Sequence, residues 1–169
     1  MTITMSGVGK PLNDKDIATL EKMLNVNLPE VYKAFLKQNN GGRPTPKFFP
    51  ILGFKNNPVG QIQDFFGIDD PVESCNLDWN YRTFLGRIPE NLFPIACEDG
   101  GSLICLSLSG PDKDAVYYWD YYGEAHPPSY DNVYQIAGTF QGFLDSLHFY
   151  DPLAEENTHP TLNQRDLPS

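Results

Sequence analysis

The chain has 169 residues, of which 40% are hydrophobic and 13% are aromatic, so it is long enough for one domain with a hydrophobic core and too apolar for wholesale disorder. Twelve basic and 22 acidic residues give a net charge of −10, which disfavours binding to nucleic-acid phosphates and favours a basic protein partner. No run approaches the roughly 18 apolar residues of a membrane span, and the N-terminus lacks an apolar signal core. We therefore expect a cytoplasmic protein without membrane contact.

The first predicted element is a helix that begins after Asn13. Residues 1–12 show no periodicity and are expected to form a flexible lead. Asn is a favoured N-cap, and the apolar residues Ile17, Leu20 and Leu24 recur at the spacing of a half-buried helix. These features predict one amphipathic helix near the N-terminus.

A second helix is predicted to begin at Pro29, because proline is tolerated at the first helical position, where its missing N–H has no helical partner. The sequence Asn40-Gly41-Gly42 predicts a left-handed end to this helix. Strands are predicted over residues 48–54 and 61–68, and Pro50 indicates that the first of them lies at a sheet edge.

A third helix follows from apolar residues at helical spacing and is expected to end near Gly86; its members are Leu77, Tyr81, Phe84 and Leu85. The block from Phe93 to Asp120 then predicts a β-meander. Its first turn contains Asp99 and Gly100, a pair that tight hairpin turns favour, and residues 109–114 form the second turn.

Aromatic residues crowd the third strand of this meander, over residues 116–122. Strand alternation would place one set of residues on one face and a second set on the other: Tyr117, Trp119 and Tyr121, and Val116, Tyr118, Asp120 and Tyr122. Two interpretations remain open. Helices and loops cover both faces and make all the aromatics core, or one face is a recognition surface in which Tyr and Trp act beside acids.

Residues 133–137 are predicted as a final strand, and Thr139 as the cap of a last helix whose apolar face is Phe140, Phe143, Leu144 and Leu147. From Asp151 onward apolar residues thin out, so residues 151–169 are expected to be a disordered tail. Helices at both ends with strands between them indicate an α+β fold: a single twisted, mainly antiparallel sheet with helices packed on one face.

The sequence contains no recognisable catalytic or metal-binding motif. The run from Gly7 to Lys10 lacks the glycine spacing of a phosphate loop, and the three histidines are far apart. Acid–base catalysis would require two carboxylates that converge, which a sequence does not reveal. We therefore expect no enzymatic activity, no cofactor and no bound metal.

The three cysteines, Cys75, Cys97 and Cys105, are an odd number without a Cys-x-x-Cys pair. We expect free thiols in a reducing compartment, although the predicted hairpin would bring Cys97 and Cys105 onto adjacent strands, where a disulfide is conceivable.

Three motifs occur in the order found in one protein family: Leu28-Pro29-Glu30-x-Tyr32-Lys33-x-Phe35-Leu36 with the following Asn-Gly-Gly; Ile95-Ala96-x-Glu98-Asp99-Gly100-Gly101 with Val116-Tyr117-Tyr118-Trp119-Asp120; and Ile136-Ala137-Gly138-Thr139-Phe140-x-x-Phe143-Leu144-x-x-Leu147. Together they resemble the SUKH superfamily, which includes bacterial toxin-immunity proteins and fungal regulators of cell-wall synthesis. Gly138 departs from the acid that often precedes the last helix in the family. Residues 56–76 match no family motif and are expected to contribute to partner specificity.

This resemblance implies a single SUKH-like domain over residues 13–150 without enzymatic activity. It predicts an immunity protein that binds a cognate basic toxin of the nuclease or deaminase type and neutralises it by occlusion, as a monomer or weak homodimer. A regulatory scaffold for cell-wall synthesis or signalling, and a small carbohydrate-active or carbohydrate-binding protein, remain as alternatives. The residues predicted to bind the partner are Asp64, Asp69, Asp70, Glu98, Asp99, Trp119, Asp120 and Tyr122.

Overall fold

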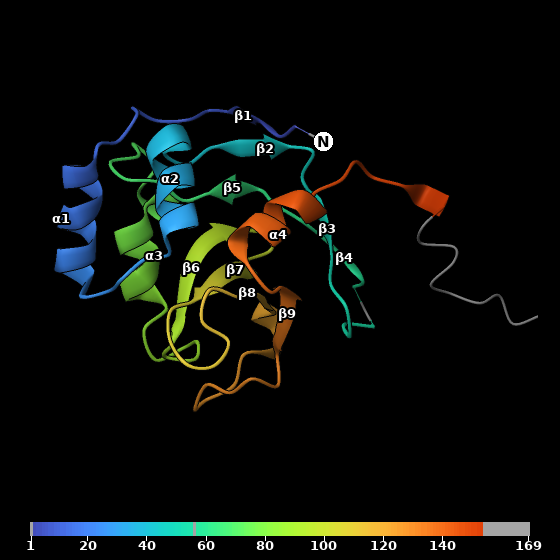
Figure 1. Ribbon diagram of the computed structural model, residues 1–169. Helices are drawn as coiled ribbons and strands as arrows, with labels where there is room; N and C mark the ends of the chain where they lie inside the picture. The colour runs from blue at the N-terminus through green and yellow to red at the C-terminus, as the bar shows by residue number, and fades with distance from the viewer. Residues whose placement is uncertain (1, 56, 154–169) are drawn as a thin grey trace, which may run out of the picture.

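The described strands form one five-stranded sheet and two separate two-stranded sheets (Figure 1). The computed structural model describes residues 2–55 and 57–153. The helices are α1 (Asp14–Leu24), α2 (Glu30–Asn39), α3 (Leu77–Thr83) and α4 (Phe140–Ser146), with 3-10 turns η1 (Glu73–Cys75) and η2 (Tyr121–Gly123). The strands are β1 (Thr4–Ser6), β2 (Arg43–Thr45), β3 (Phe48–Pro50), β4 (Val59–Gln61), β5 (Asp64–Phe65), β6 (Leu92–Cys97), β7 (Leu103–Ser107), β8 (Val116–Trp119) and β9 (Val133–Ala137).

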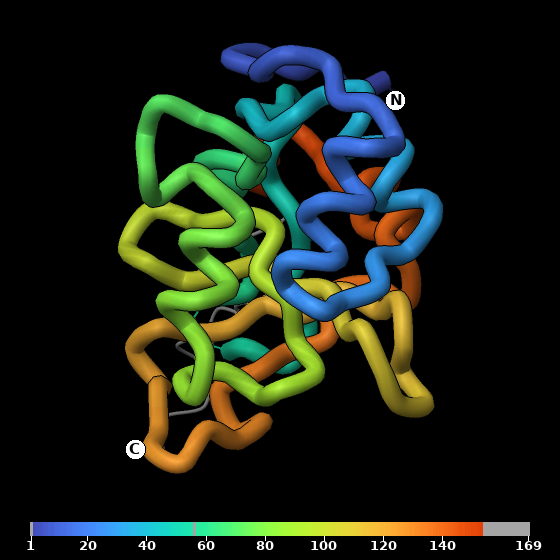
Figure 2. Tube along the Cα trace, turned by 90° about the vertical axis from the view of Figure 1, so that its left-hand side faces the viewer, coloured from blue at the N-terminus to red at the C-terminus, as the bar shows by residue number. Residues whose placement is uncertain are grey.

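The main sheet has the order β5-β6-β7-β8-β9, and every neighbouring pair is antiparallel. This confirms the α+β class and the β-meander. The expectation of a single sheet requires revision, because β1 pairs with β2 and β3 pairs with β4 in sheets of their own. Figures 1 and 2 show α1, α2 and α3 gathered at one side of the molecule, while α4 lies over the middle of the sheet in the view of Figure 1.

The N-terminal segment contains regular structure that the sequence pattern did not predict. Met5 of β1 lies opposite Pro44 of β2, so part of the segment expected to be a flexible lead is paired in a sheet. Of the predicted tail, residues 151–153 are exposed, and residues 154–169 lie outside the described part of the chain.

Local capping signals set the helix ends close to where they were predicted. Asn13 and Asp16 form a reciprocal capping box at the start of α1, and Asn40 ends α2 in the left-handed conformation with φ of 32°. Pro29 is the N-cap of α2 instead of its first residue. The Thr139 hydroxyl accepts a hydrogen bond from the Gly142 N–H, so α4 is capped although Gly138 precedes it.

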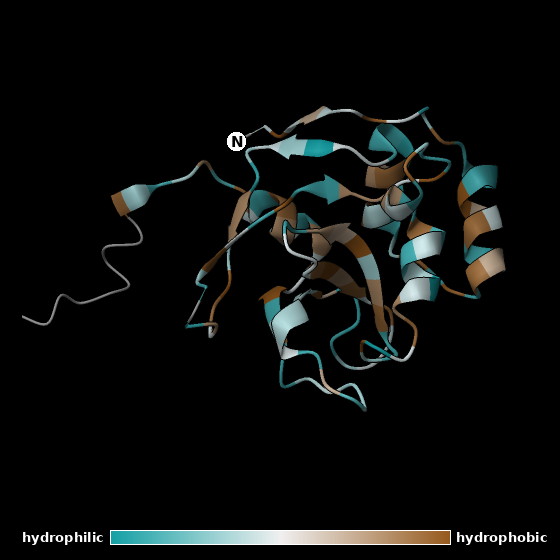
Figure 3. Ribbon diagram, turned by 180° about the vertical axis from the view of Figure 1, so that it is seen from behind, coloured by the Kyte–Doolittle hydropathy of each residue, from teal (hydrophilic) through white to brown (hydrophobic). Residues whose placement is uncertain are grey.

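The hydrophobic core is centred on β6, β7 and β8, which appear as the brown strands in the middle of Figure 3. Every residue of β8 is buried. The Trp119 ring contacts Phe84 just beyond α3, whereas the neighbouring Tyr118 ring contacts Phe49 and Phe54 of the β3–β4 region. Both faces of β8 are therefore covered, and of the two interpretations of its aromatics the core interpretation holds for residues 116–119.

Candidate protein-interaction surface

Two turns meet at one end of the main sheet. The register pairs Leu103 with Cys97 on one side and with Trp119 on the other, so the turn between β6 and β7 lies beside the end of β8. The chain leaves β8 directly into η2. We call the exposed part of these turns the turn surface and define it as Asp99, Asp120, Tyr121 and Tyr122.

Glycines in the β6–β7 turn allow its left-handed backbone beside the tyrosines. Gly100 and Gly101 have φ of 97° and 98°, a left-handed conformation that side chains rarely adopt. A Cβ added to Gly101 would lie 3.4 Å from the Tyr121 ring, and one added to Gly100 would lie 3.6 Å from the Tyr122 hydroxyl. The two tyrosine side chains therefore lie beside the glycine turn.

Backbone hydrogen bonds fix the orientation of the tyrosines. The Asp120 carboxylate accepts the Tyr122 N–H at 3.2 Å, and the Ser102 hydroxyl accepts the Tyr121 N–H at 3.1 Å. The Asn132 side chain donates to the Asp120 carbonyl at 2.8 Å. The two tyrosine rings pack edge to face with centroids 5.5 Å apart. The hydrogen bonds hold the backbone of this turn, and the Tyr122 side chain packs on Tyr121 while 82% of Tyr122 is exposed.

The turn surface also displays unpaired negative charge. Asp99 is exposed and Asp120 is half-buried. Among the ion pairs of the described residues, none includes either of these carboxylates. The nearby Glu124 is different, because Arg87 holds it through two hydrogen bonds of 2.7 and 2.9 Å and so ties η2 to the loop after α3.

Glu98 lies beneath this surface and links strands instead of facing solvent. Its carboxylate accepts the Tyr118 hydroxyl at 2.5 Å and the Gln61 N–H at 3.2 Å. Burial raises the pKa of Glu98, and the neighbouring negative charges of Asp99 and Asp120 raise it further. Only 8% of Glu98 is exposed, so it supports the turn from below.

The structure brings together five of the eight residues predicted from the sequence: Glu98, Asp99, Trp119, Asp120 and Tyr122. Trp119 is only 1% exposed, so it offers no surface for a partner. The alternative of a carbohydrate-binding protein requires an accessible Trp119 ring on which a sugar could stack, and this ring is buried.

Asp64 and the acidic pair Asp69–Asp70 lie in other local settings. Asp64 is opposite Cys97 and binds Arg43 at 2.9 Å. Asp69 and Asp70 line a separate pocket beside η1 and α3, where the Asp70 carboxylate accepts the Val72 N–H.

Tyr121 was assigned to a strand face by the sequence pattern, and its role in the turn surface was missed. The strand ends at Trp119, and the chain then turns through η2. The signal available was Asp120, a residue type that often caps a turn by accepting an N–H two residues further on.

The described residues contain no group of three or more His, Cys, Asp or Glu side chains placed to hold a metal ion.

All three cysteines are free, and burial raises the pKa of Cys97 to about 11, which opposes formation of a reactive thiolate. No helix in the described ranges combines the length and apolar character needed to cross a membrane.

Comparison with known proteins gives two findings. The model of the SMI1/KNR4 family (SUKH-1) matches residues 11–146. The SPbeta prophage-derived protein YokK of Bacillus subtilis (strain 168) is 28% identical over 151 residues, in an alignment that covers 79% of this chain and 73% of YokK. The family match spans the first two motifs from which the resemblance was inferred and all of the third except Leu147, and it confirms the resemblance.

Proposed function

The chain belongs to the SMI1/KNR4 family (SUKH-1), and from this premise we propose that it is an immunity-type protein that binds a cognate protein toxin and neutralises it without catalysis. The family includes immunity proteins. We further propose that the toxin is basic, that it is a nuclease or deaminase, and that binding takes place in the cytoplasm, where free cysteines stay reduced.

The observation that supports this proposal most directly is the exposed tyrosine pair beside two carboxylates that form no ion pair with the described residues. Tyrosines that are held in one orientation lose little conformational entropy on binding and often dominate interface energies. Asp99 and Asp120 would attract basic residues around the active site of the toxin, and this charge complementarity speeds association. The turn surface would thus cover the active site and exclude its substrate.

We propose that the remaining predicted acidic residues, Asp64, Asp69 and Asp70, contact the toxin outside the turn surface. Asp69 and Asp70 are joined by Asp78 around a pocket of about 390 Å³ with the half-buried Trp79 in its wall. Asp64 already pairs with Arg43, so it has less charge to offer a partner. We expect the turn surface to contribute most of the affinity, and these acids to contribute mainly to the rate of encounter.

A rescue experiment tests the proposal. Cells that express the cognate toxin should survive when the wild-type chain is co-expressed, and Asp99→Lys should weaken the rescue because it places a cation in the turn surface. Asp131→Lys is the matched control, since Asp131 is also exposed and lies outside the turn surface. If folded Asp99→Lys protects as fully as Asp131→Lys, the turn surface is not the binding site.

A further inference from the structure

A second site lies where the strand pairing opens between β2 and the β4–β5 segment. The Phe65 N–H donates to the Gly42 carbonyl at 2.8 Å, and the Ile62 N–H donates to the Lys47 carbonyl at 2.9 Å. Between these two bonds, residues 43–46 face only residues 63–64, so the two chains separate. Pro44 and Pro46 have no N–H with which to continue the ladder.

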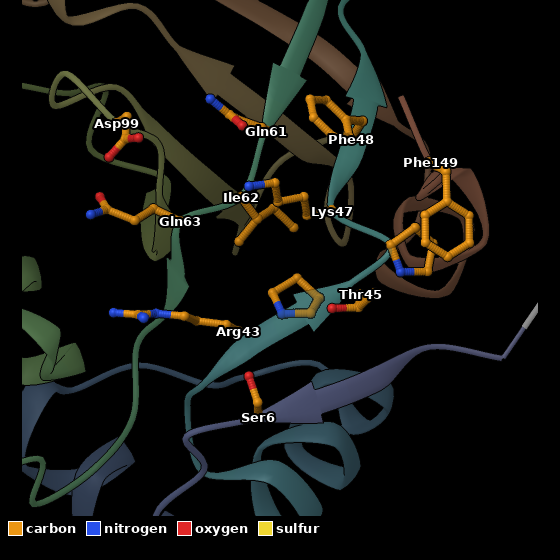
Figure 4. A pocket seen from close by; sticks show the side chains of 12 residues that line it. Ser6, Arg43, Thr45, Lys47, Phe48, Gln61, Ile62, Gln63, Asp99 and Phe149 are labelled. Atoms are coloured by element: carbon orange, nitrogen blue, oxygen red, sulfur yellow. The ribbon is translucent and has the colours of Figure 1, made fainter. Parts of the chain in front are cut away.

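This opening forms a pocket of about 500 Å³, a size typical of ligand sites. Figure 4 shows its labelled side chains. Ile62 is only 1% exposed and, together with Pro44 and Pro46, gives the pocket an apolar floor. Ser6 and Thr45 add hydroxyl groups from β1 and β2. The pocket therefore combines apolar surface with hydrogen-bond donors.

Two cationic side chains, Lys47 and Arg43, line this pocket, although the net charge of the chain is −10. In Figure 4 the Lys47 side chain extends into the pocket, toward the wall that contains Gln63 and Asp99. Lys47 forms no ion pair with the described residues, and its ammonium lies 5.7 Å from the centre of the Phe48 ring. Arg43 uses its Nε–H for Asp64 and keeps its terminal N–H groups for other acceptors.

We propose that this pocket binds a carboxylate attached to an apolar group, and specifically the C-terminal residue of a peptide or protein. The apolar floor receives the terminal side chain, and Lys47 binds the carboxylate. A peptide is favoured over a small free acid because the side-chain amides of Gln61 and Gln63 stand along one wall and are suited to pair with a peptide main chain.

Asp99 at the same wall adds a selective element. A carboxylate there disfavours an acidic residue in the peptide just before its terminus and favours a basic one. Asp99 also belongs to the turn surface, so the two sites adjoin. The pocket proposal does not depend on the immunity function, since it can be tested with isolated peptides.

Nuclear magnetic resonance titration of the full chain tests the pocket with three probes: the peptide acetyl-Gly-Lys-Leu with a free carboxylate, the same peptide with a C-terminal amide, and isovalerate as a small free acid. We expect the free peptide to shift the backbone amide signals of residues 43, 45, 47 and 61–63. We expect the amidated peptide to bind at least about tenfold more weakly, because it lacks the charge that Lys47 recognises. Isovalerate binding as well as the free peptide would assign the pocket to small acids and overturn the peptide proposal.

Two lysine variants complete the experiment. Lys47→Met keeps most of the aliphatic stem and removes the charge, and it should weaken binding of the free peptide about tenfold or more. Lys15→Met makes the same change in net charge at an exposed position of α1 and should leave binding unchanged. Equal affinities for the free and amidated peptides, or wild-type affinity in Lys47→Met, would show that Lys47 holds no carboxylate.

Discussion

Glu98 is the residue whose protonation most directly couples to the turn surface. Its pKa in the folded protein is raised above the ordinary value of 4.5, chiefly by burial. A carboxyl whose folded pKa is raised binds its proton more tightly in the native state, so its favourable contribution to stability is present at low pH and lost as pH rises through the raised pKa.

Glu98→Gln is therefore expected to remove this loss of stability with rising pH. Relative to the wild type, the free energy of unfolding of the variant should rise between about pH 4.5 and neutral pH, since the neutral amide is not penalised by burial. Denaturant unfolding at several pH values measures this difference. A difference in unfolding free energy that stays constant or falls across this pH interval would show that the surroundings of Glu98 do not disfavour its charged form.

A glycine in the β6–β7 turn gives a second test at this scale. Gly101→Ala places a Cβ at φ of 98° and against Tyr121, and should cost about 1–3 kcal/mol of unfolding free energy. Gly138→Ala is the control, because a Cβ there meets nothing within 4 Å. Chemical denaturation should find Gly138→Ala neutral or slightly stabilised. An equal effect of both changes would contradict the left-handed conformation of Gly101.

At the scale of elements, the ion pair between Arg87 and Glu124 anchors η2 to the loop after α3. The Arg87 guanidinium lowers the pKa of Glu124, whose side chain is 15% exposed, so the stabilisation is present above the ordinary pKa of 4.5 and lost as pH falls through the lowered one. Arg87 also lies over the Phe84 ring at 4.6 Å.

Arg87→Ala should lower the unfolding free energy by about 1–3 kcal/mol at pH 7, because it leaves Glu124 largely buried without its partner. Arg82→Ala is the matched control. Arg82 pairs with Asp78 one turn away at 3.7 Å on an exposed helix face, where such pairs contribute about 0.5 kcal/mol or less. Urea unfolding compares the two, and similar losses would rule out an anchoring role for Arg87.

The elements that the sequence predicted well are those specified by local signals. Asn13, Asn40 and Thr139 each mark a helix end through bonds to residues at most four positions away, so a sequence reveals them. Strand β1 was missed because its partner is β2, and the pairing of Met5 with Pro44 spans two helices.

Contacts between residues distant in sequence also limited what could be predicted of the candidate site. Alternation along β8 predicts which aromatic residues share a face, but not what covers each face. Tyr118 is buried by Phe49 and Phe54, and Trp119 by Phe84, all of them distant in sequence. Acidic residues at a turn were predictable, whereas exposure of Tyr121 and Tyr122 depends on where the strand ends.

At the scale of the whole molecule, the net charge of −10 governs how a partner approaches. If the toxin is basic, long-range attraction accelerates association and salt screens it. Raising NaCl from about 0.05 to 0.5 M should lower the association rate constant about tenfold or more and change the dissociation rate constant much less. Stopped-flow mixing measures both. An association rate insensitive to salt would mean that the partner is not recruited by charge.

The central claim is that the turn surface, anchored by Tyr122, binds the toxin. The most direct test is the dissociation constant of the purified complex, measured by calorimetry for Tyr122→Ala and for Tyr130→Ala, which removes a partly exposed tyrosine outside the turn surface. We predict that Tyr122→Ala weakens binding at least about tenfold, or about 1.4 kcal/mol, and that Tyr130→Ala leaves affinity near the wild-type value. Wild-type affinity in a folded Tyr122→Ala variant would contradict the claim.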